Sequence, residues 1–577
     1  MCGIAGLSLS RKAPSLSKTL DKMAAALQHR GPDDQGKHVV QDKVGLAHTR
    51  LAINDIEGGH QPFTTPTGIV AIANGEIYNH LDLRKELNPA LELKTHSDCE
   101  PIPYLYKQYG PDFVKHLRGM YAIALYDPHL DQLFLARDPF GIKPLYYAQT
   151  PQGLAFASEP QALIKGGLVK ATLNTKGRDE LLALNFTLGN HTLFAGIHRV
   201  LPGETLIVQK GKVINRHQNS YFSFDQEQIT EASALEKFQT EMANSMKAHL
   251  LSDVPVGLFL SGGIDSTTLL LFMSQYASKG FKTYSIGFPG TLAHDERKRA
   301  RELSKKLGTT HRELTFTEED FWELLPKVAK SLDDPTADYA CLPTYKLAQA
   351  VAQDGIKVVL SGEGGDELFA GYGRYRKALS PWRLGTKSLR RGNFDRLKIL
   401  KRPLPSVKKA IKIQQELASS HAAPQTRLQQ LQALDSTTWL PNDLMIKLDR
   451  CLMAHSLEGR PPFLDKRMAK FALPLPDKLK IKNRLGKWLV RQWLSTACPE
   501  AKPFSKKRGF TVPVGEWMAK KRDALAEELS TAPCLLEIAT KESLYNFFKS
   551  LDPQNKHHTQ AAWSLLFYRT WHKEHLE

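Results

Sequence analysis

A cysteine stands at position 2, directly after the initiator methionine, in the sequence MCGIAG. If Met1 is removed, this one residue carries both a thiol and a free α-amino group. An α-amine has a pKa of about 8, so near physiological pH it accepts the thiol proton without help from a histidine. Cys2 is therefore a candidate nucleophile. The alternative is that Cys2 has no chemical role and is only a small residue at a frayed terminus.

Four short segments follow Cys2 in the first hundred residues and carry polar groups suited to a small zwitterion. Each of them alone could be a turn, a surface arginine or a hairpin, but turns do not explain all of them in this order. The segments are residues 28–33 (QHRGPD), 50–53 (RLAI), 74–79 (NGEIYN) and 97–98 (SD).

With these segments, the first third of the chain closely resembles the class II glutamine amidotransferases, which have an N-terminal-nucleophile fold. The resemblance implies that Cys2 attacks the side-chain amide of glutamine and releases ammonia from a glutamyl thioester. It assigns the oxyanion hole to the Asn74 side chain and the Gly75 backbone N–H.

The same resemblance assigns the two charged ends of glutamine to residues of opposite charge. Arg50 would grip the α-carboxylate in a bidentate pair, and Asp98, assisted by Glu76, would hold the α-ammonium. These assignments are chemically consistent with one another.

A second constellation, residues 260–266 (LSGGIDS), stands between an apolar run (254–260) and a helix-like segment (STTLLLFMSQYA). Glycines let backbone N–H groups approach a ligand, and a helix N-terminus adds positive potential. The string therefore predicts an anion cradle, without the lysine of a Walker A loop. The alternative is a simple strand-to-helix turn of small residues.

Residues 361–367 (SGEGGDE) again follow a predicted strand. Mg²⁺ prefers few carboxylates together with phosphate oxygens, so Asp265 and Asp366 are candidates to share this ion with a nucleotide. Alternatively, Glu363, Asp366 and Glu367 only cap the following helix.

The first string matches the pyrophosphate loop of the ATP pyrophosphatases. With the second string, nearly the whole chain resembles the glutamine-hydrolysing asparagine synthetases of the bacterial B type. The resemblance implies that Glu363 acts in forming the acyl-adenylate and receiving ammonia, and that Lys487 of GKWLVR steadies the phosphates. It implies ATP as substrate and Mg²⁺ as cofactor. The implied ATP-binding residues are Leu260, Ser261, Gly262, Gly263, Asp265, Ser266, Ile286, Ser361 and Gly362.

Residues 448–450 (LDR) and 458–465 (EGRPPFLD) match the family segment near the acceptor pocket and the ammonia tunnel. Gly459 and Pro461 depart from it, since the family often has Ala or Val, and a β-branched residue, at these positions. The predicted substrates are glutamine, ATP and aspartate, with asparagine as the product. The runner-up is a paralogue that amidates a sugar uronate or a peptide acid.

Three further alternatives explain less of the sequence. A non-catalytic polyanion-binding protein accounts for the charge but not for the ordered motifs. A lone glutaminase or a phosphoribosyl-amine synthase would not need SGGIDS. A β-lactam-forming relative would not need the glutaminase residues Cys2, Arg50, Asn74 and Asp98.

The elements that must position these residues fall into two groups. Short alternating strands with tight turns fill the first third and predict an α+β sandwich of stacked antiparallel sheets between helices. From residue 254 strands alternate with helices, which predicts a parallel sheet in an α/β domain, and after residue 375 the chain is mainly helical. The predicted domains are a glutaminase over residues 2–212 and a synthetase over residues 230–577.

The 577 residues carry 78 Lys and Arg against 60 Asp and Glu, a net charge of +18. Residues 374–413 hold 14 of these cations against Asp395 alone, so the excess is largely one local patch. A solvated face is its simplest interpretation, and no nucleic-acid-binding module is recognisable. We expect no membrane contact and a reducing, cytoplasmic location, since six scattered cysteines form no C-x-x-C pair. A homodimer is common in the family.

Overall fold

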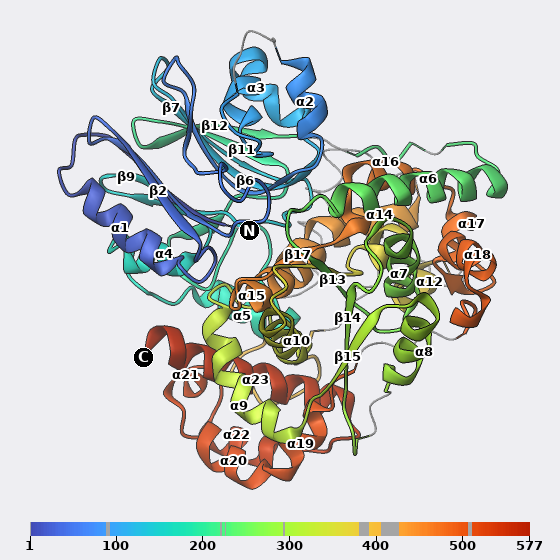
Figure 1. Cartoon of the computed structure of the whole chain (residues 1–577). Coiled ribbons are helices and arrows are strands. Elements are labelled where there is room, and N and C mark those ends of the chain that lie inside the picture. Colours follow the sequence, from blue (N-terminus) through green and yellow to red (C-terminus); the bar gives the residue numbers. More distant parts are fainter. Residues whose placement is uncertain are drawn as a thin grey trace.

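The computed structural model describes residues 2–87, 93–219, 222–225, 227–291, 295–379, 392–404, 426–505 and 511–577. Of the basic patch, residues 380–391 and 405–413 lie outside these ranges. Figure 1 shows two parts, the blue to cyan N-terminal sheets and the green to red remainder, with the N-terminus at the boundary between them.

The N-terminal part contains two six-stranded antiparallel sheets. The first has the order β10 (Ile197–Arg199), β8 (Tyr146–Thr150), β9 (Gly153–Ala157), β1 (Gly3–Leu9), β3 (Val44–Arg50) and β2 (Asp34–Val40). The second has the order β12 (Lys212–Gln218), β11 (Glu204–Gln209), β7 (Gln132–Arg137), β6 (Gly119–Asp127), β5 (Val70–Ile77) and β4 (Phe63–Thr64).

Apolar side chains from both sheets form one shared core, which includes Ile4 and Leu46 from the first sheet and Ile72 and Leu135 from the second. Every residue of β1 is buried, because this strand is central in its sheet and covered on both faces. Helices α1 (Leu16–Ala26) and α4 (Pro160–Lys165) lie on the outer side of the first sheet, and α2 (His80–Glu86) and α3 (Pro101–Tyr109) on that of the second (Figure 1). The predicted sandwich of stacked antiparallel sheets between helices is confirmed.

The second part is built on a five-stranded sheet in which every pair is parallel. Its order is β15 (Thr310–Thr315), β14 (Lys282–Gly287), β13 (Val256–Phe259), β16 (Val358–Leu360) and β17 (Glu458–Arg460). The chain proceeds from β13 to β14 on one side and returns later to β16 on the other. The strand order therefore reverses between β13 and β16, the point where ligands bind in open α/β sheets.

Helices follow or precede each strand of this sheet, as parallel connections require. They are α7 (Ile264–Tyr276), α8 (Arg297–Leu307), α9 (Glu318–Ser331), α10 (Cys341–Gln353) and α15 (Met445–Met453). The predicted parallel α/β sheet is confirmed. The sequence did not, however, predict β17, whose three residues had been identified only as part of a family segment.

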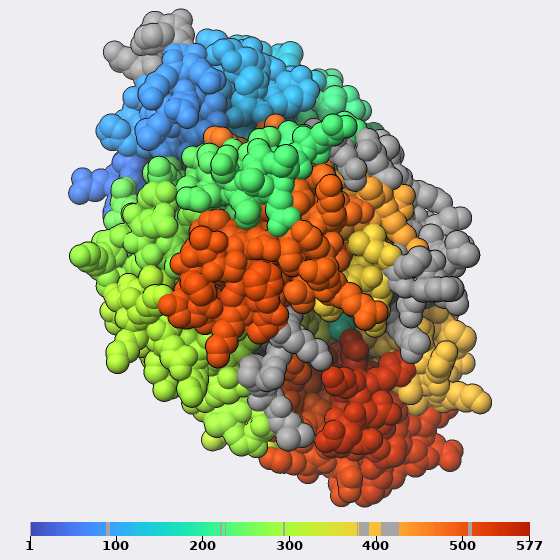
Figure 2. All heavy atoms as spheres, turned by 90° about the vertical axis from the view of Figure 1, so that its right-hand side faces the viewer, coloured from blue at the N-terminus to red at the C-terminus, as the bar shows by residue number. Residues whose placement is uncertain are grey.

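The remainder is mainly helical, as predicted, and its orange and red segments fill much of the face that Figure 2 shows. Besides α6 (Glu231–His249), which begins this part, it includes α11 (Gly365–Leu368), α12 (Gly373–Ala378), α14 (Arg427–Thr437), α16 (Lys466–Ala472), α18 (Trp488–Ala497) and α19 (Val514–Lys520) to α23 (Lys556–Leu576). The indoles of Trp563 and Trp571 in α23 donate hydrogen bonds to the carbonyls of Ala337 (2.7 Å) and Leu332 (2.9 Å). The last helix thus fixes the loop between α9 and α10.

Candidate active site

Cys2 immediately precedes β1 and is buried at the boundary between the two parts. Its backbone nitrogen donates to Asn74 Oδ1 (3.1 Å), and its carbonyl accepts from Arg30 Nε (3.1 Å). Burial raises the pKa of the Cys2 thiol above its ordinary value. The thiol therefore needs a nearby base, and its own α-amine after removal of Met1 would be the nearest.

Asn74 and Gly75 lie on β5 beside Cys2, as the resemblance requires. Asn74 is fully buried, and within the described part of the chain its Nδ2 has no hydrogen-bond partner. A buried unpaired donor is costly, so this amide is suited to a charge that develops only during a reaction. At Gly75 any side chain would overlap the backbone of Met120 on β6, so the strand pairing itself requires glycine there.

Glu76 and Asp98 are both buried carboxylates. Burial raises the pKa of Asp98, although the Ile77 backbone N–H donates to its Oδ2 (2.6 Å). Burial also raises the pKa of Glu76 well above its ordinary value, and the Asp98 carboxylate adds to this shift. A bound ammonium group would favour the ionised form of both carboxylates and so lower both pKa values, which is compatible with the role predicted for these residues.

Arg50, the last residue of β3, is held by a loop instead of a carboxylate. Its guanidinium donates to the carbonyls of Asn54 (3.1 Å), Asp55 (2.5 Å) and Ile56 (3.1 Å). The structure therefore brings Cys2, Asn74 and Gly75 together and Glu76 next to Asp98, and it directs Arg50 to the neighbouring 54–56 loop. The predicted roles of all six residues stay predictions.

The two glycine-rich loops meet at the carboxyl ends of β13 and β16. Gly263 is the residue before α7, and its backbone N–H donates to Ser261 Oγ (3.2 Å), which also contacts Ser266 Oγ (3.0 Å). A Cβ at Gly365 would lie 2.6 Å from Asp265 Oδ1, and one at Gly362 would lie 3.1 Å from Asp265 Cβ. Glycines in the second loop thus allow it to approach the first.

Lys487 brings the carboxylates of both loops to one point. Its Nζ contacts Asp265 Oδ2 and lies 2.7 Å from Asp366 Oδ1, and the side chain is only 2% exposed. Burial alone would lower the pKa of Lys487, but Asp265 and Asp366 raise it. Its φ of 57° is left-handed, which is unfavourable for a residue with a side chain, so the surrounding contacts must hold this conformation.

The remaining predicted nucleotide residues line the same edge of the sheet. Leu260 and Ile286 are buried at the ends of β13 and β14. Ser361 follows β16 and contacts Glu363 through its hydroxyl, and Glu363 is half-buried. The sequence thus identified a set of residues that the fold gathers at the switch point of the sheet.

Two carboxylates that converge on one ammonium are a fitting donor set for Mg²⁺ shared with phosphates. Over the described ranges, no group of three or more His, Cys, Asp or Glu side chains could hold a metal by itself. The residues therefore fit an ion that arrives with a nucleotide and do not fit a protein-only metal cage.

Sequence reasoning assigned no role to a set of buried charges between the two parts. Arg30 is fully buried and forms a bidentate pair with Asp449 (2.8 and 2.9 Å), and its Nη1 also lies 2.7 Å from Glu159 Oε1. Arg450 Nη1 lies 3.0 Å from Glu159 Oε1, and Arg118 Nη2 lies 2.8 Å from Asp465 Oδ2. The segments QHRGPD and LDR were the available signals, since both resemble family segments and contain Arg30, Asp449 and Arg450.

Arg460 on β17 connects the two candidate sites most directly. Its Nη2 lies 3.3 Å from Glu76 Oε1, and its Nε lies 2.5 Å from Glu458 Oε1. Its carbonyl accepts the backbone N–H of Ser361 (2.9 Å), the first residue of the second loop. Two contacts of Arg460, one through its side chain and one through its carbonyl, therefore link the predicted ammonium site of glutamine to the predicted nucleotide loop.

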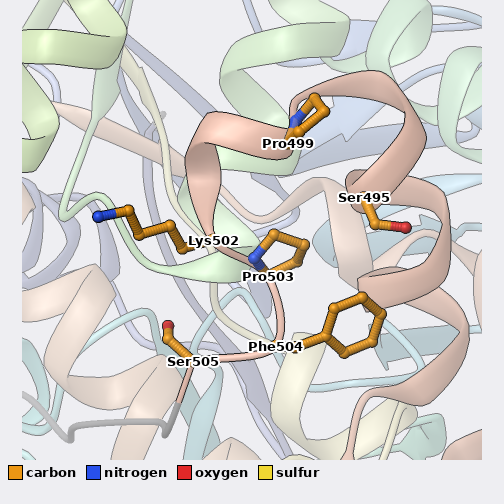
Figure 3. A pocket seen from close by; sticks show the side chains of 6 residues that line it. All are labelled: Ser495, Pro499, Lys502, Pro503, Phe504 and Ser505. Carbon is orange, nitrogen blue, oxygen red and sulfur yellow. The ribbon is translucent and has the colours of Figure 1, made fainter.

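A surface cavity of about 320 Å³ lies between the end of α18 and the segment that follows it (Figure 3). It is lined by Ser495, Pro499, Lys502, Pro503, Phe504 and Ser505. Arg491 holds its wall by donating to the carbonyls of Pro503 and Ser505 (3.2 Å). None of the predicted site residues lines it. Within the described residues, no helix is long and apolar enough to cross a membrane.

Comparisons with known proteins agree with this division of the chain. Residues 237–573 match the family model described as asparagine synthase, and residues 1–222 match that of a glutamine amidotransferase domain. The chain is 30% identical to asparagine synthetase [glutamine-hydrolyzing] 1 of Bacillus subtilis, over 100% of this chain and 97% of that relative. It is 29% identical to asparagine synthetase B [glutamine-hydrolyzing] of Escherichia coli, over 92% of this chain and 86% of that relative.

The family match covers more than half of the chain, and the first of these relatives aligns with all of it. The resemblance found in the sequence is therefore confirmed. The chain belongs to the asparagine synthase family, with a glutamine amidotransferase domain in its first 222 residues, and it is an ATP-dependent amidotransferase ligase.

Proposed function

We propose that this enzyme converts aspartate to asparagine, with ATP as the activating substrate and glutamine as the source of ammonia. The observation that carries the proposal is the convergence of Asp265, Asp366 and Lys487 at the switch point of the parallel sheet, with Arg460 linking Glu76 to the first residue of the loop that contains Asp366. The names of the relatives support aspartate as the acceptor.

In the first half-reaction, the Cys2 sulfur attacks the amide carbon of glutamine. The carbonyl oxygen becomes an oxyanion, to which the unpartnered Nδ2 of Asn74 donates. The α-amine of Cys2, which takes the thiol proton during the attack, returns it to the nitrogen, so that ammonia leaves. Water then hydrolyses the thioester to glutamate and the free thiol. Glu76 and Asp98 hold the α-ammonium and Arg50 turns from its loop carbonyls to the α-carboxylate, so the amide stays aligned with the sulfur.

In the second half-reaction, the side-chain carboxylate of aspartate attacks the α-phosphorus of ATP, and pyrophosphate leaves. The backbone of residues 261–266 holds the phosphates, and Lys487 offsets the charge that develops on them. Asp265 and Asp366 would hold Mg²⁺, which supplies further charge neutralisation when bound. Ammonia then attacks the acyl carbon of the adenylate, AMP leaves, and Glu363 accepts the surplus proton.

Ammonia passes between the sites through the buried boundary of the two parts. Lys143, next to this route, is fully buried, and burial lowers its pKa. A boundary that excludes water in this way keeps ammonia from being protonated and lost to solvent.

The proposal is tested by measuring pyrophosphate release with ATP and ammonium while the acceptor is varied. We expect turnover with aspartate and little with glutamate, a sugar uronate or an aspartyl peptide. Turnover with a uronate or a peptide in place of aspartate would establish the runner-up function.

Replacing the nucleophile separates the two half-reactions. Cys2→Ala should abolish glutamine-dependent synthesis and leave ammonium-dependent pyrophosphate release within about twofold of the parent, because added ammonium bypasses the thiol. Cys534→Ala, at a buried cysteine in the C-terminal helices, is the matched control and should retain both activities. Loss of both activities in a folded Cys2→Ala protein would refute the two-site scheme.

A further inference from the structure

The second glycine-rich loop continues into α11, a helix of only four residues. The carbonyls at the end of so short a helix have no partner within it, so they need donors from elsewhere. Gln432 serves two of them, because its Nε2 donates to the carbonyls of Glu367 (2.7 Å) and Leu368 (2.8 Å). Asp366 immediately precedes Glu367 in the same turn, so Gln432 holds the backbone that carries a predicted Mg²⁺ ligand.

The neighbouring carbonyls are met from within the candidate site. The Asp366 carbonyl accepts from the backbone N–H of Gly371 (2.8 Å), and the Phe369 carbonyl accepts from that of Lys487 (2.9 Å). Gln432 instead comes from α14, a helix that carries none of the predicted site residues. It therefore ties the turn of α11 to a part of the core that lies outside the site.

The orientation of the Gln432 amide is fixed by a lysine. Gln432 is fully buried, and its Oε1 accepts from Nζ of Lys480 (2.9 Å), the last residue of α17 (Asp477–Lys480). A lysine ammonium only donates hydrogen bonds, so this contact turns the oxygen of the amide to Lys480 and its nitrogen to α11. The opposite orientation would place Oε1 against the two carbonyls of α11 and the amide N–H groups against the ammonium.

Lys480 itself stands in an unfavourable place. It is fully buried, and the Leu473 carbonyl (2.8 Å) and Gln432 Oε1, to which it donates, are both neutral oxygens. Burial lowers the pKa of Lys480 to about 7, which the Asp477 carboxylate offsets only in part. An apolar side chain of similar length would avoid this cost of desolvation. Stability alone therefore does not explain Lys480, which favours a role in placing Gln432.

We propose that Gln432 is a positioning residue of the nucleotide site, which keeps the Asp366 carboxylate where it meets Lys487 and can share Mg²⁺ with ATP. Lys480 acts through Gln432, by orienting its amide. This inference rests on the nucleotide half of the proposed function. Groups that have to converge on one ion tolerate displacements of only about 0.5 Å, so a loosened α11 weakens Mg²⁺ binding although every ligand is still present.

The test measures equilibrium binding of α,β-methylene-ATP, whose α–β linkage is not cleaved, to the full chain by calorimetry. Binding is measured once with Mg²⁺ and once with EDTA, and the ratio of the two Kd values reports what the metal contributes. Gln432→Met should reduce this ratio about 10- to 100-fold, the usual effect of removing a group that holds a metal ligand in place. The Kd in EDTA should stay within about threefold of the parent's, because the metal-free analogue gains nothing from Asp366.

Lys480→Met tests the second half of the inference. It should reduce the ratio about fivefold, the usual effect of one hydrogen bond, because the Gln432 amide is then free to turn. The double variant should be no worse than Gln432→Met alone, because Lys480 acts through Gln432. Lys480→Met exchanges a buried cation for an apolar side chain of similar length, so it should fold. It decides the question even where Gln432→Met does not fold.

Gln429→Met is the matched control. Gln429 is also fully buried on α14, and its Nε2 donates to the carbonyls of Phe224 (2.8 Å) and Leu473 (3.4 Å). Its replacement should lower the Tm about as much as Gln432→Met does and leave the ratio of the Kd values unchanged. Glutamine hydrolysis at Cys2 reports that each variant is folded.

The possible failures are distinguishable. If the parent binds the analogue no more tightly with Mg²⁺ than in EDTA, the nucleotide half of the proposed function fails, and the inference fails with it. If the parent prefers the Mg²⁺ complex but the folded variants at Gln432 and Lys480 keep that preference, lower it no more than Gln429→Met, or have additive effects, the inference alone is overturned. The acceptor does not enter this measurement, so a parent that rejects aspartate overturns only the assignment of aspartate.

Discussion

Asn74 uses the two ends of one side chain for two tasks. Its Oδ1 fixes the Cys2 nitrogen, and its buried Nδ2 is available for an oxyanion. We predict that Asn74→Ala lowers the kcat of glutamine hydrolysis by about 10²–10³, the usual effect of removing one oxyanion donor. Glutamate release measures the effect, and ammonium-dependent pyrophosphate release is the internal control. A decrease of less than tenfold would contradict the oxyanion role.

Glu367, next to Asp366, makes the stability of the unliganded protein depend on pH. Burial, with a contribution from Asp366, raises the pKa of Glu367 from 4.5 to about 7, and Tyr372 donates to its Oε1 (2.6 Å). Because the folded state prefers the protonated carboxyl, its stabilising contribution is complete below about pH 4.5 and is lost as the pH rises through about 7. The difference corresponds to at most about 3 kcal/mol.

Glu367→Gln should remove this pH dependence, since a glutamine keeps the acceptor for Tyr372 and does not ionise. We expect the Tm of the variant to exceed that of the parent by an amount that grows between pH 5 and pH 8. Thermal unfolding at both pH values measures it. A constant difference across this range would show that Glu367 is already ionised in the folded protein.

At the scale of elements, the turn between α11 and α12 must lie against the residues that lead into α18. A Cβ at Gly371 would overlap the Asp366 carboxylate and the Lys487 side chain. We predict that Gly371→Ala lowers ATP-dependent pyrophosphate release at least about a hundredfold, because the two charges can no longer pair, and leaves glutamine hydrolysis intact. Gly373→Ala is the control, since a Cβ there meets only the flexible end of Arg376 (3.3 Å). Equal activity of both variants would contradict the close packing.

The elements also show where sequence reasoning succeeds and where it ends. The loops after β13 and β16 were predictable because each combines an apolar strand, glycines and a helix start within a few consecutive residues. β17 was not, because three residues carry no periodicity and their strand conformation comes from pairing with β16. The contact of Arg30 with Asp449 was equally hidden, because it joins two residues 419 positions apart in the chain. The domain boundaries and the site roles stay predictions.

At the scale of the whole molecule, Arg30 links the backbone of Cys2 to Asp449 in the second part of the chain. We predict that Asp449→Ala destabilises the protein by about 3–5 kcal/mol, because the buried Arg30 loses its principal partner. Denaturant unfolding measures the change. The same variant should hydrolyse more than one glutamine for each AMP formed, because the boundary admits water.

Lys115→Ala is the control for this prediction. Lys115 pairs with Asp112 at the surface, with both side chains more than half exposed, and its loss should cost at most about 1 kcal/mol. A similarly small effect of Asp449→Ala would show that the Arg30 charge is stabilised by Glu159 alone.

The buried boundary also limits how far the two parts can be treated as interchangeable modules. Arg30, Glu76, Arg118 and Glu159 on one side each face a specific charge among Asp449, Arg450, Arg460 and Asp465 on the other. A hybrid enzyme that received its first 222 residues from a relative without these charges would bury unpaired charges there. In such a graft, residues 449–465 have to come from the same donor as the amidotransferase part.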